Sequence, residues 1–124
     1  MAISQDFLDF LQDQLRGLGH ITTRRMFSGA AIYCDGVVFA LVLRDALYFK
    51  VDDGNRGAYE AEGLEPFIYE ARGKPVRVEA YRRVPERLFD DPDEMLEWAR
   101  AALAAGRRAA SNTTKKRKKR KQKS

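Results

Sequence analysis

Two side chains in this sequence of 124 residues are of the types that supply a nucleophile and a base: the single cysteine, Cys34, and the single histidine, His20. A catalytic thiol needs a base within hydrogen-bond reach, and nothing in the spacing places His20 beside Cys34. A lone cysteine at the end of a strand usually fills space as a small apolar side chain. We therefore expect no enzymatic activity and no catalytic residue. The remote alternative is an enzyme built on Cys34 or on a pair of carboxylates.

Carboxylates gather at two places where a cation could bind. The first, "VDDGNR" at 51–56, lacks the ligand number and the closing glutamate of a calcium loop. Capping and turn formation by Asp52, Asp53 and Asn55 is therefore the favoured interpretation. The second, "DDPDE" at 90–94, lies where negative charge stabilises a helix N-terminus. One His and one Cys cannot form a zinc site without several carboxylates, so we expect neither a metal nor a cofactor.

The strongest charge signal is the run "KKRKKRKQKS" at 115–124, in which eight of ten residues are Lys or Arg. Because 8 of the 23 basic residues lie there, residues 1–110 hold 15 basic residues against all 18 acidic ones, a formal charge of −3. Attraction to phosphate is therefore concentrated in this basic run. The residues predicted to bind nucleic acid are Lys115, Lys116, Arg117, Lys118, Lys119, Arg120, Lys121 and Lys123.

A segment of like charges without apolar residues cannot bury enough surface to fold. We therefore predict a domain at 1–110 and a disordered basic tail at 111–124, with 106–114 as a flexible link. Such a tail binds the backbone of DNA or RNA through counterion release, without reading bases. The competing interpretation is a solubilising tail that has no partner.

Arg24 and Arg25 would face opposite sides of a strand. One interpretation makes them a site for a ligand or partner. The favoured interpretation pairs one of them with a nearby carboxylate, such as Asp52 or Asp53.

A second basic surface is suggested by the last two predicted strands, where Tyr69 and Tyr81 lie among basic residues. Aromatic strands beside basic groups bind single-stranded nucleic acid. We favour an ordinary sheet with one solvated face, because Glu70 and Glu79 in the same strands offset the charge. The basic residues concerned are Arg72, Lys74, Arg77, Arg82, Arg83 and Arg87.

The elements that position these side chains follow from periodicity and turn signals. A helix capped by Ser4 comes first, and one strand follows within 22–33. Asp35-Gly36 then predicts a hairpin, since both central residues of a type I′ turn need positive φ. The strand after it, 37–43, is apolar throughout, so we expect it to be covered on both sides or central in its sheet.

The second half of the chain also shows signals for strands and helices. Residues 47–51 predict a strand with one apolar face, and a short helix then ends at Gly63. Two further strands, about 67–70 and 76–82, are joined by a turn at 72–74.

The last helix begins at the N-cap Asp91, with Trp98 largely buried beside its apolar stripe, and Gly106 weakens its end. Because strands linked by short turns pair antiparallel, we predict an α+β fold. It has one five-stranded antiparallel sheet with helices packed on it, in the order α-β-β-β-α-β-β-α. The N-terminus lacks the features of a signal peptide, and no stretch approaches the roughly 20 apolar residues of a membrane span. We expect a cytoplasmic protein without membrane contact.

Several motifs agree in order with one family pattern. "RRMFSG", "LYFKVDDGNR", "AEGLEPFIY" and "DDPDEMLEWAR" follow its "RRMFGG", "LYxKVDDxNR", "AxGxxPFxY" and "DDPDExxxWAR". From about Arg24 to Ala105 the sequence thus resembles the N-terminal domain of the TfoX family, also called Sxy. It departs from the pattern at Ser28, which replaces a frequent glycine, and at Ala30 and Ala31, which replace a glycine or an aromatic residue.

This resemblance implies a role in regulation. The family is associated with natural competence, and its full-length members resemble coactivators of a cyclic-AMP receptor-type transcription factor. We therefore expect a non-enzymatic regulatory or adaptor protein with a single TfoX N-terminal domain. Its body would contact a transcription factor or another protein, and its tail would associate with DNA or RNA without sequence preference. The alternative is a protein-interaction or small-ligand module in which the tail is incidental. The oligomeric state stays open, a weak homodimer included.

Overall fold

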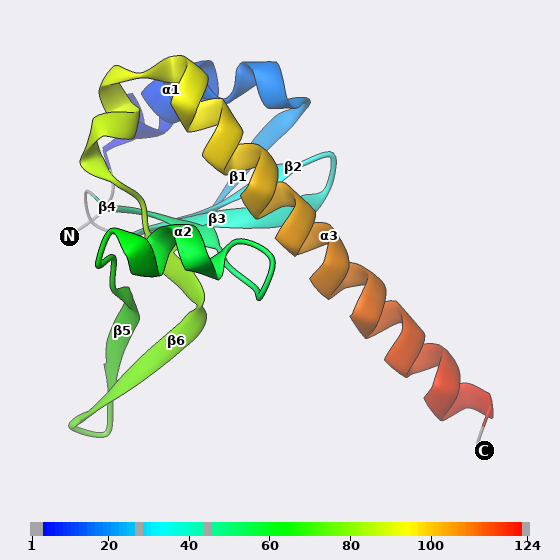
Figure 1. The fold of residues 1–124 in the computed structure, drawn as a ribbon. Coiled ribbons are helices and arrows are strands. Elements are labelled where there is room, and N and C mark those ends of the chain that lie inside the picture. The colour runs from blue at the N-terminus through cyan, green and yellow to red at the C-terminus, as the bar shows by residue number, and fades with distance from the viewer. Residues whose placement is uncertain (1–3, 27–28, 44–45, 123–124) are drawn as a thin grey trace.

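The computed structural model describes residues 4–26, 29–43 and 46–122, and for 113–122 it describes the backbone only. The described residues form three α-helices, two 3₁₀ turns and one antiparallel sheet of six strands in the order β1-β2-β3-β4-β6-β5 (Figure 1). The elements in chain order are α1 (Gln5–Gln14), a 3₁₀ turn (Arg16–Leu18), β1 (Ile21–Met26), β2 (Gly29–Cys34), β3 (Val37–Leu43), β4 (Ala46–Lys50), α2 (Arg56–Ala61), β5 (Pro66–Ala71), β6 (Lys74–Arg83), a 3₁₀ turn (Glu86–Asp90) and α3 (Pro92–Gln122).

The α+β class is confirmed, but the prediction of five strands is wrong. The segment 22–33, interpreted as one strand, contains the two paired strands β1 and β2, with Met26 opposite Gly29. The order is therefore α-β-β-β-β-α-β-β-α. The hairpin was missed because no Asn-Gly or Asp-Gly pair marks it, and its connection, 27–28, lies outside the described residues. Gly29 instead serves close packing, since a Cβ atom there would overlap the carbonyl oxygen of Val42.

Two other hairpins have the predicted turn chemistry. Asp35 and Gly36 have φ of 50° and 83°, as a type I′ turn requires, and β3 begins and ends at the predicted residues. Arg72 and Gly73, with φ of 55° and 76°, join β5 to β6 in the same way. Figure 1 shows β5 and β6 as an arm that projects from the body of the molecule.

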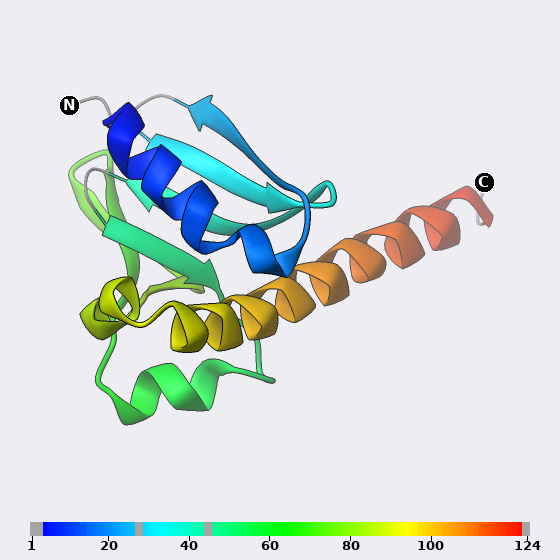
Figure 2. The same cartoon turned by 90° about the horizontal axis from the view of Figure 1, so that it is seen from above.

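The core lies between one face of the sheet and the helices α1 and α3 (Figure 2). Leu8 and Leu11 of α1 and Met95 and Ala99 of α3 are buried there against strand residues such as Phe49. Ser4 Oγ accepts a hydrogen bond from the Phe7 amide, and Asp91 Oδ1 accepts one from the Glu94 amide, so both predicted N-caps are present. Trp98 is only partly buried, because it packs against the edge of this core beside Tyr59 of α2.

The helix α3 is longer than predicted. The sequence predicts disorder from residue 111, whereas α3 continues to Gln122. Lys, Arg and Gln are good helix formers, and extending a helix that is already nucleated fixes only one residue for each added hydrogen bond. Gly106 does not end the helix. A Cβ atom there would lie 2.6 Å from the carbonyl oxygen of Val38, so the glycine lets α3 approach β3 closely. None of the described helices is long and apolar enough to cross a membrane.

Candidate functional site

The basic run is carried away from the body by α3. The last residue of that helix that is described as buried is Gly106, and Figures 1 and 2 show the remainder projecting past the sheet. Seven of the eight predicted nucleic-acid-binding residues, Lys115 to Lys121, lie on this helical extension, and Lys123 lies outside the described residues. The backbone of residues 115–121 thus continues α3.

An ion pair holds α3 where it leaves the body. Arg108 Nε and Nη2 donate to Asp52 Oδ2 and Oδ1 at 2.6 and 2.8 Å, which joins the helix to the loop after β4. The hydrogen bonds from Arg108 hold the pKa of Asp52 below its usual value, with a further contribution from the amide of Gly54. A Cβ atom at Gly54 would lie 2.8 Å from Arg108 Nη2, so the glycine leaves room for the guanidinium. We call this pair the α3 clamp.

The loop that presents Asp52 is itself fixed by hydrogen bonds. Asn55 Oδ1 accepts from the Asp52 amide at 2.8 Å, and Asn55 Nδ2 donates to the Lys50 carbonyl at 3.0 Å. Turn formation by Asp52 and Asn55 is therefore confirmed. The expected pairing of Asp52 or Asp53 with Arg24 or Arg25 is wrong.

The partners of those residues lie elsewhere. Asp52 binds Arg108, Asp53 binds Arg56 at 2.6 Å, and Arg25 donates to Gln5 Oε1 at 2.8 Å. No local signal pointed to the clamp, because Arg108 is 56 residues away from its partner.

A second ionic cluster forms around Arg87. Its guanidinium binds both oxygens of Glu62, at 2.5 and 2.8 Å, and both oxygens of Glu94, at 2.9 Å. It also lies 5.8 Å from the centre of the Trp98 ring. The hydrogen bonds from Arg87 lower the pKa of Glu62 and of Glu94. This cluster ties α2 to the start of α3.

The basic residues in and after the last two strands do not form one cluster, and a basic surface there is the alternative that the sequence favours less. Arg87 is occupied as described, and Glu79 binds both Arg77 at 3.1 Å and Arg82 at 3.3 Å. Arg82 is largely buried, with 12 % of its side chain exposed, and donates to the Leu64 carbonyl. Three of the six basic residues therefore serve structural contacts. The other three, Arg72, Lys74 and Arg83, are exposed.

His20 and Cys34 come closer than the spacing indicated. The Asp35 amide donates to the His20 carbonyl at 2.9 Å, which places the two segments side by side. The side chains differ in surroundings, since Cys34 is buried in the core and His20 is exposed. Burial, followed by the charge and the hydrogen bond of Asp35, raises the pKa of the Cys34 thiol and disfavours the reactive thiolate.

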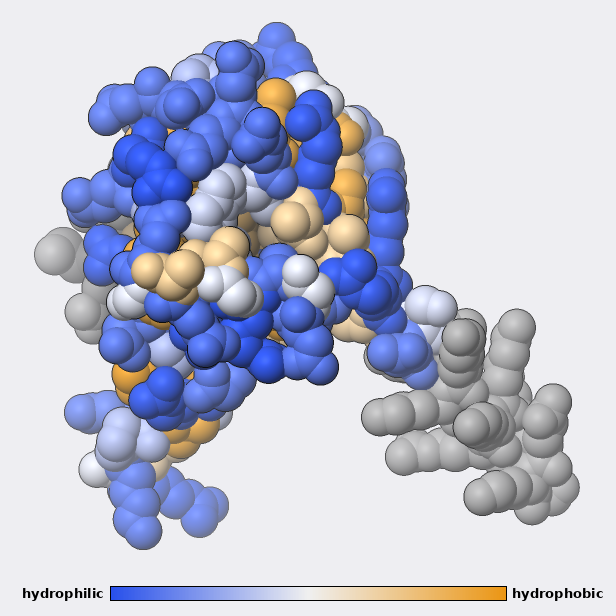
Figure 3. Space-filling view, viewed as in Figure 1, coloured by the Kyte–Doolittle hydropathy of each residue, from blue (hydrophilic) through white to orange (hydrophobic). Residues whose placement is uncertain are grey.

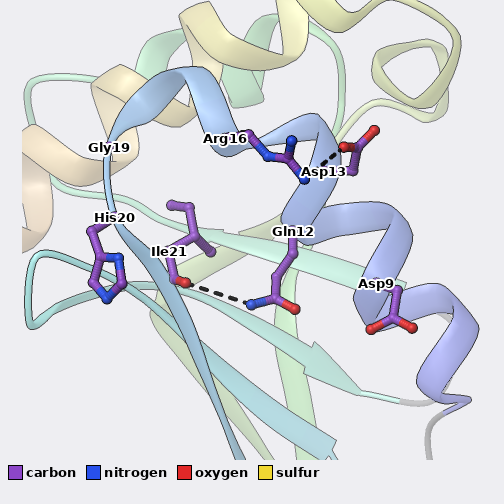
Figure 4. A pocket seen from close by; sticks show the side chains of 7 residues that line it. All are labelled: Asp9, Gln12, Asp13, Arg16, Gly19, His20 and Ile21. Atoms are coloured by element: carbon purple, nitrogen blue, oxygen red, sulfur yellow. Dashed lines mark hydrogen bonds and ion pairs between the residues drawn. The ribbon is translucent and has the colours of Figure 1, made fainter.

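A hollow of about 420 Å³ lies between α1 and the start of β1. Figure 4 shows His20 and Asp9 at opposite ends of it, with Asp13 and Arg16 paired at its rim at 3.1 Å. Gln12 Nε2 donates to the Ile21 carbonyl at 3.5 Å. Among the described residues, no three potential metal ligands come together. A smaller hollow of about 260 Å³ brings Arg83 near Glu86 and Asp90.

Comparison with known proteins bears on most of this chain. The family model of the TfoX N-terminal domain matches residues 13–106, which contain the sheet, α2 and the buried part of α3. No curated protein matches the chain.

Proposed function

Because the chain belongs to the TfoX N-terminal domain family, we propose that it is a non-enzymatic regulatory or adaptor domain that also associates with nucleic acid. The body would bind a protein partner, such as a transcription factor, and the basic run would bind phosphate. The observation that supports this is the continuation of α3 to Gln122, beyond its last buried residue, with the α3 clamp at its base.

The association expected from the basic run is electrostatic. Each phosphate that Lys or Arg neutralises releases condensed counterions, and this release supplies most of non-specific affinity. The body carries a formal charge of −3, so it repels phosphate weakly and contributes little to this term. Charge alone does not read base edges, so this association would not depend on sequence.

A second candidate function is a small-ligand or protein-interaction module. It is favoured by a hollow of about 210 Å³ between α2 and α3, lined in part by Tyr59 and Trp98. The Tyr59 hydroxyl is buried and has no hydrogen-bond partner among the described residues. A buried hydroxyl without a partner costs free energy unless something satisfies it, which a ligand in this hollow would do.

Truncation tests the first function. A chain ending at Ala110 should lose most of its affinity for duplex DNA at low salt, measured by fluorescence anisotropy. For the full chain, log K should fall against log salt with a slope of at most about 7, because eight basic residues contribute about 0.9 each. A truncated chain that binds duplex DNA as tightly as the full chain would contradict the proposal.

Substitution within the basic run changes its charge but keeps the length of the chain, so it tests the effect of charge alone. Replacing Lys118, Lys119 and Arg120 with glutamine should reduce the slope by about 3. The matched control replaces three exposed basic residues of the body, Arg16, Arg72 and Arg100, and should leave the slope within about 1 of the native value. Equal effects of the two triple variants would show that total charge, and not the run, governs binding.

A further inference from the structure

One face of the sheet is left without a covering helix. Cross-strand register forms a row from Arg24 through Ala31, Leu41 and Tyr48 to Arg83. Paired residues point to the same side, and neighbours along a strand point to the opposite side. Ala31 is buried but does not belong to the core cluster, whereas Ile32 and Phe49 do. The row therefore lies on the side of the sheet away from α1 and α3. Figures 1 and 2 show both helices on one side of these strands.

Aromatic rings continue this uncovered face onto the β5–β6 arm. The rings of Tyr48 and Phe67 are 5.3 Å apart and those of Phe67 and Tyr69 are 5.9 Å apart. Tyr69 is 46 % exposed, so its ring is accessible to a ligand. Lys50 lies 4.9 Å from the centre of the Tyr81 ring. Figure 3, viewed from the side on which α2 and α3 lie, shows apolar residues in orange on the arm among hydrophilic neighbours.

Within the strands, the charge of this face has one sign, although Arg83 also lies near Glu86 and Asp90 in the hollow described above. Arg24 and Arg83 end the row, and Lys50 lies beside it. The carboxylates within the six described strands are Glu70 and Glu79, which the sequence analysis expected to offset the positive charge. Both lie on the opposite side: Glu70 follows Tyr69 directly, and Glu79 binds Arg77 and Arg82.

We infer that this uncovered face binds single-stranded nucleic acid, its rings stacking on bases and its basic side chains contacting phosphates. The paired bases of a duplex stack on one another and cannot lie flat on a sheet, whereas an unpaired strand offers both its bases and its charge. An acidic protein partner would match the charge but not the exposed rings. The inference goes beyond the proposed function, because it concerns a different surface from the basic run.

Neighbouring residues on opposite sides of one strand provide matched variants. Tyr69 and Ile68 are each 46 % exposed, so Tyr69→Ala and Ile68→Ala remove similar exposed apolar groups from opposite faces. Arg24→Ala and Arg25→Ala form a second pair, since Arg25 points toward Gln5 of α1. The probes are oligo-dT and oligo-U of about 12 nucleotides, within the length that one such surface covers.

With the full chain, Tyr69→Ala should weaken binding of these probes about tenfold, and Ile68→Ala less than about twofold. Arg24→Ala should weaken binding and lower the salt slope by about 0.7, unlike Arg25→Ala. Tyr69→Leu keeps apolar bulk without a ring and should weaken binding as Tyr69→Ala does, which separates stacking from folding. A loss with only one of the two probes also supports the inference and identifies the strand as DNA or RNA.

Three results would overturn the inference. The members of each pair could have equal effects. Tyr69→Ala could leave the binding of both probes unchanged. Tyr69→Ala could instead abolish a dimer seen in sedimentation while probe binding is unaffected, which would assign the face to a second copy of the chain. A failure of the proposed function can be told apart from a failure of this inference. The proposed function is tested by duplex binding of the chain that ends at Ala110, and this inference by single-stranded probes.

Discussion

Arginine has two different uses in this molecule. Arg87 and Arg108 bind carboxylates of elements that are distant in sequence. Arg82 binds Glu79 of its own strand and donates to the distant Leu64 carbonyl. The sequence could show that these residues were basic, but it could not show which of them were already neutralised. Glu62 and Asp52 are 25 and 56 residues from their partners, and no periodic pattern links such positions. The assignment of free and occupied arginines therefore required the fold.

The Arg87 cluster should make stability depend on pH. The carboxyl pKa values of Glu62 and Glu94 lie below 4.5 in the folded state, so their contribution is fully present above about pH 4.5 and is lost as the pH falls through the folded values. Arg87→Gln should therefore lower the Tm at about pH 6, and the difference from the native chain should shrink toward about pH 3. Thermal unfolding followed by Trp98 fluorescence measures both.

The exposed pair of Arg16 and Asp13 supplies the control. Its side chains are 80 % and 75 % exposed, and such pairs contribute little. Arg16→Gln should leave the Tm nearly unchanged at both pH values. If Arg87→Gln behaved as Arg16→Gln does, the cluster would not stabilise the fold.

At the scale of elements, most of the sheet was predictable because its signals are local. Alternation along 47–51, the Asp35-Gly36 turn and the N-caps Ser4 and Asp91 all act within a few residues. What could not be predicted depends on contacts between elements. Gly106 signals a weak helix end by propensity alone, yet its place against the Val38 carbonyl lets α3 pack on β3. The uncovered face likewise emerges only when the register of the strands is known.

Two helix glycines should respond to alanine in opposite directions. At Gly106 the added Cβ would lie 2.6 Å from a backbone oxygen, and overpacking of this kind costs about 1–3 kcal/mol. That cost exceeds the gain in helix propensity, at most about 1 kcal/mol. At Gly57 of α2 nothing lies within 4 Å, so only the gain applies. Urea unfolding should show Gly106→Ala less stable, and Gly57→Ala slightly more stable, than the native chain.

These two variants are controls for each other, because both make the same chemical change within an α-helix. Stabilisation by Gly106→Ala would mean that α3 does not approach β3 as closely as the structure shows.

At the scale of the whole molecule, the chain combines a body of formal charge −3 with a helix that ends in a basic run. Among the residues whose burial the structure describes, the last buried one of α3 is Gly106, and those of the sheet and α1 lie earlier in the chain. The basic run consists only of Lys, Arg, Gln and Ser, so it has no apolar side chain to add to the core. Its charge and the fold of the body are independent properties of one chain.

Hydrogen exchange should reveal this division. Amides of β3 and of α3 up to about Ala105 should exchange most slowly, because opening them disrupts the core. Amides of α3 beyond Ala110 should exchange much faster, since no tertiary packing protects that turn of helix. A chain ending at Ala110 should keep the Tm of the full chain to within about 2 °C. A larger loss of Tm would mean that the basic run packs on the body.

The α3 clamp has one more consequence, which concerns angle. An α-helix turns about 100° and rises about 1.5 Å with each residue, so a helix fastened at Arg108 carries Gln122 about 20 Å from that point. Its rotation about its own axis is set by the buried residues that precede the clamp, such as Ala102 and Leu103. One residue inserted just after Arg108 would swing the whole basic run by about 100°, whereas removal of about seven would shorten its reach by two turns and nearly restore its orientation. The orientation of the helix backbone at the basic run therefore depends on the number of residues that separate it from the part of α3 packed on the body.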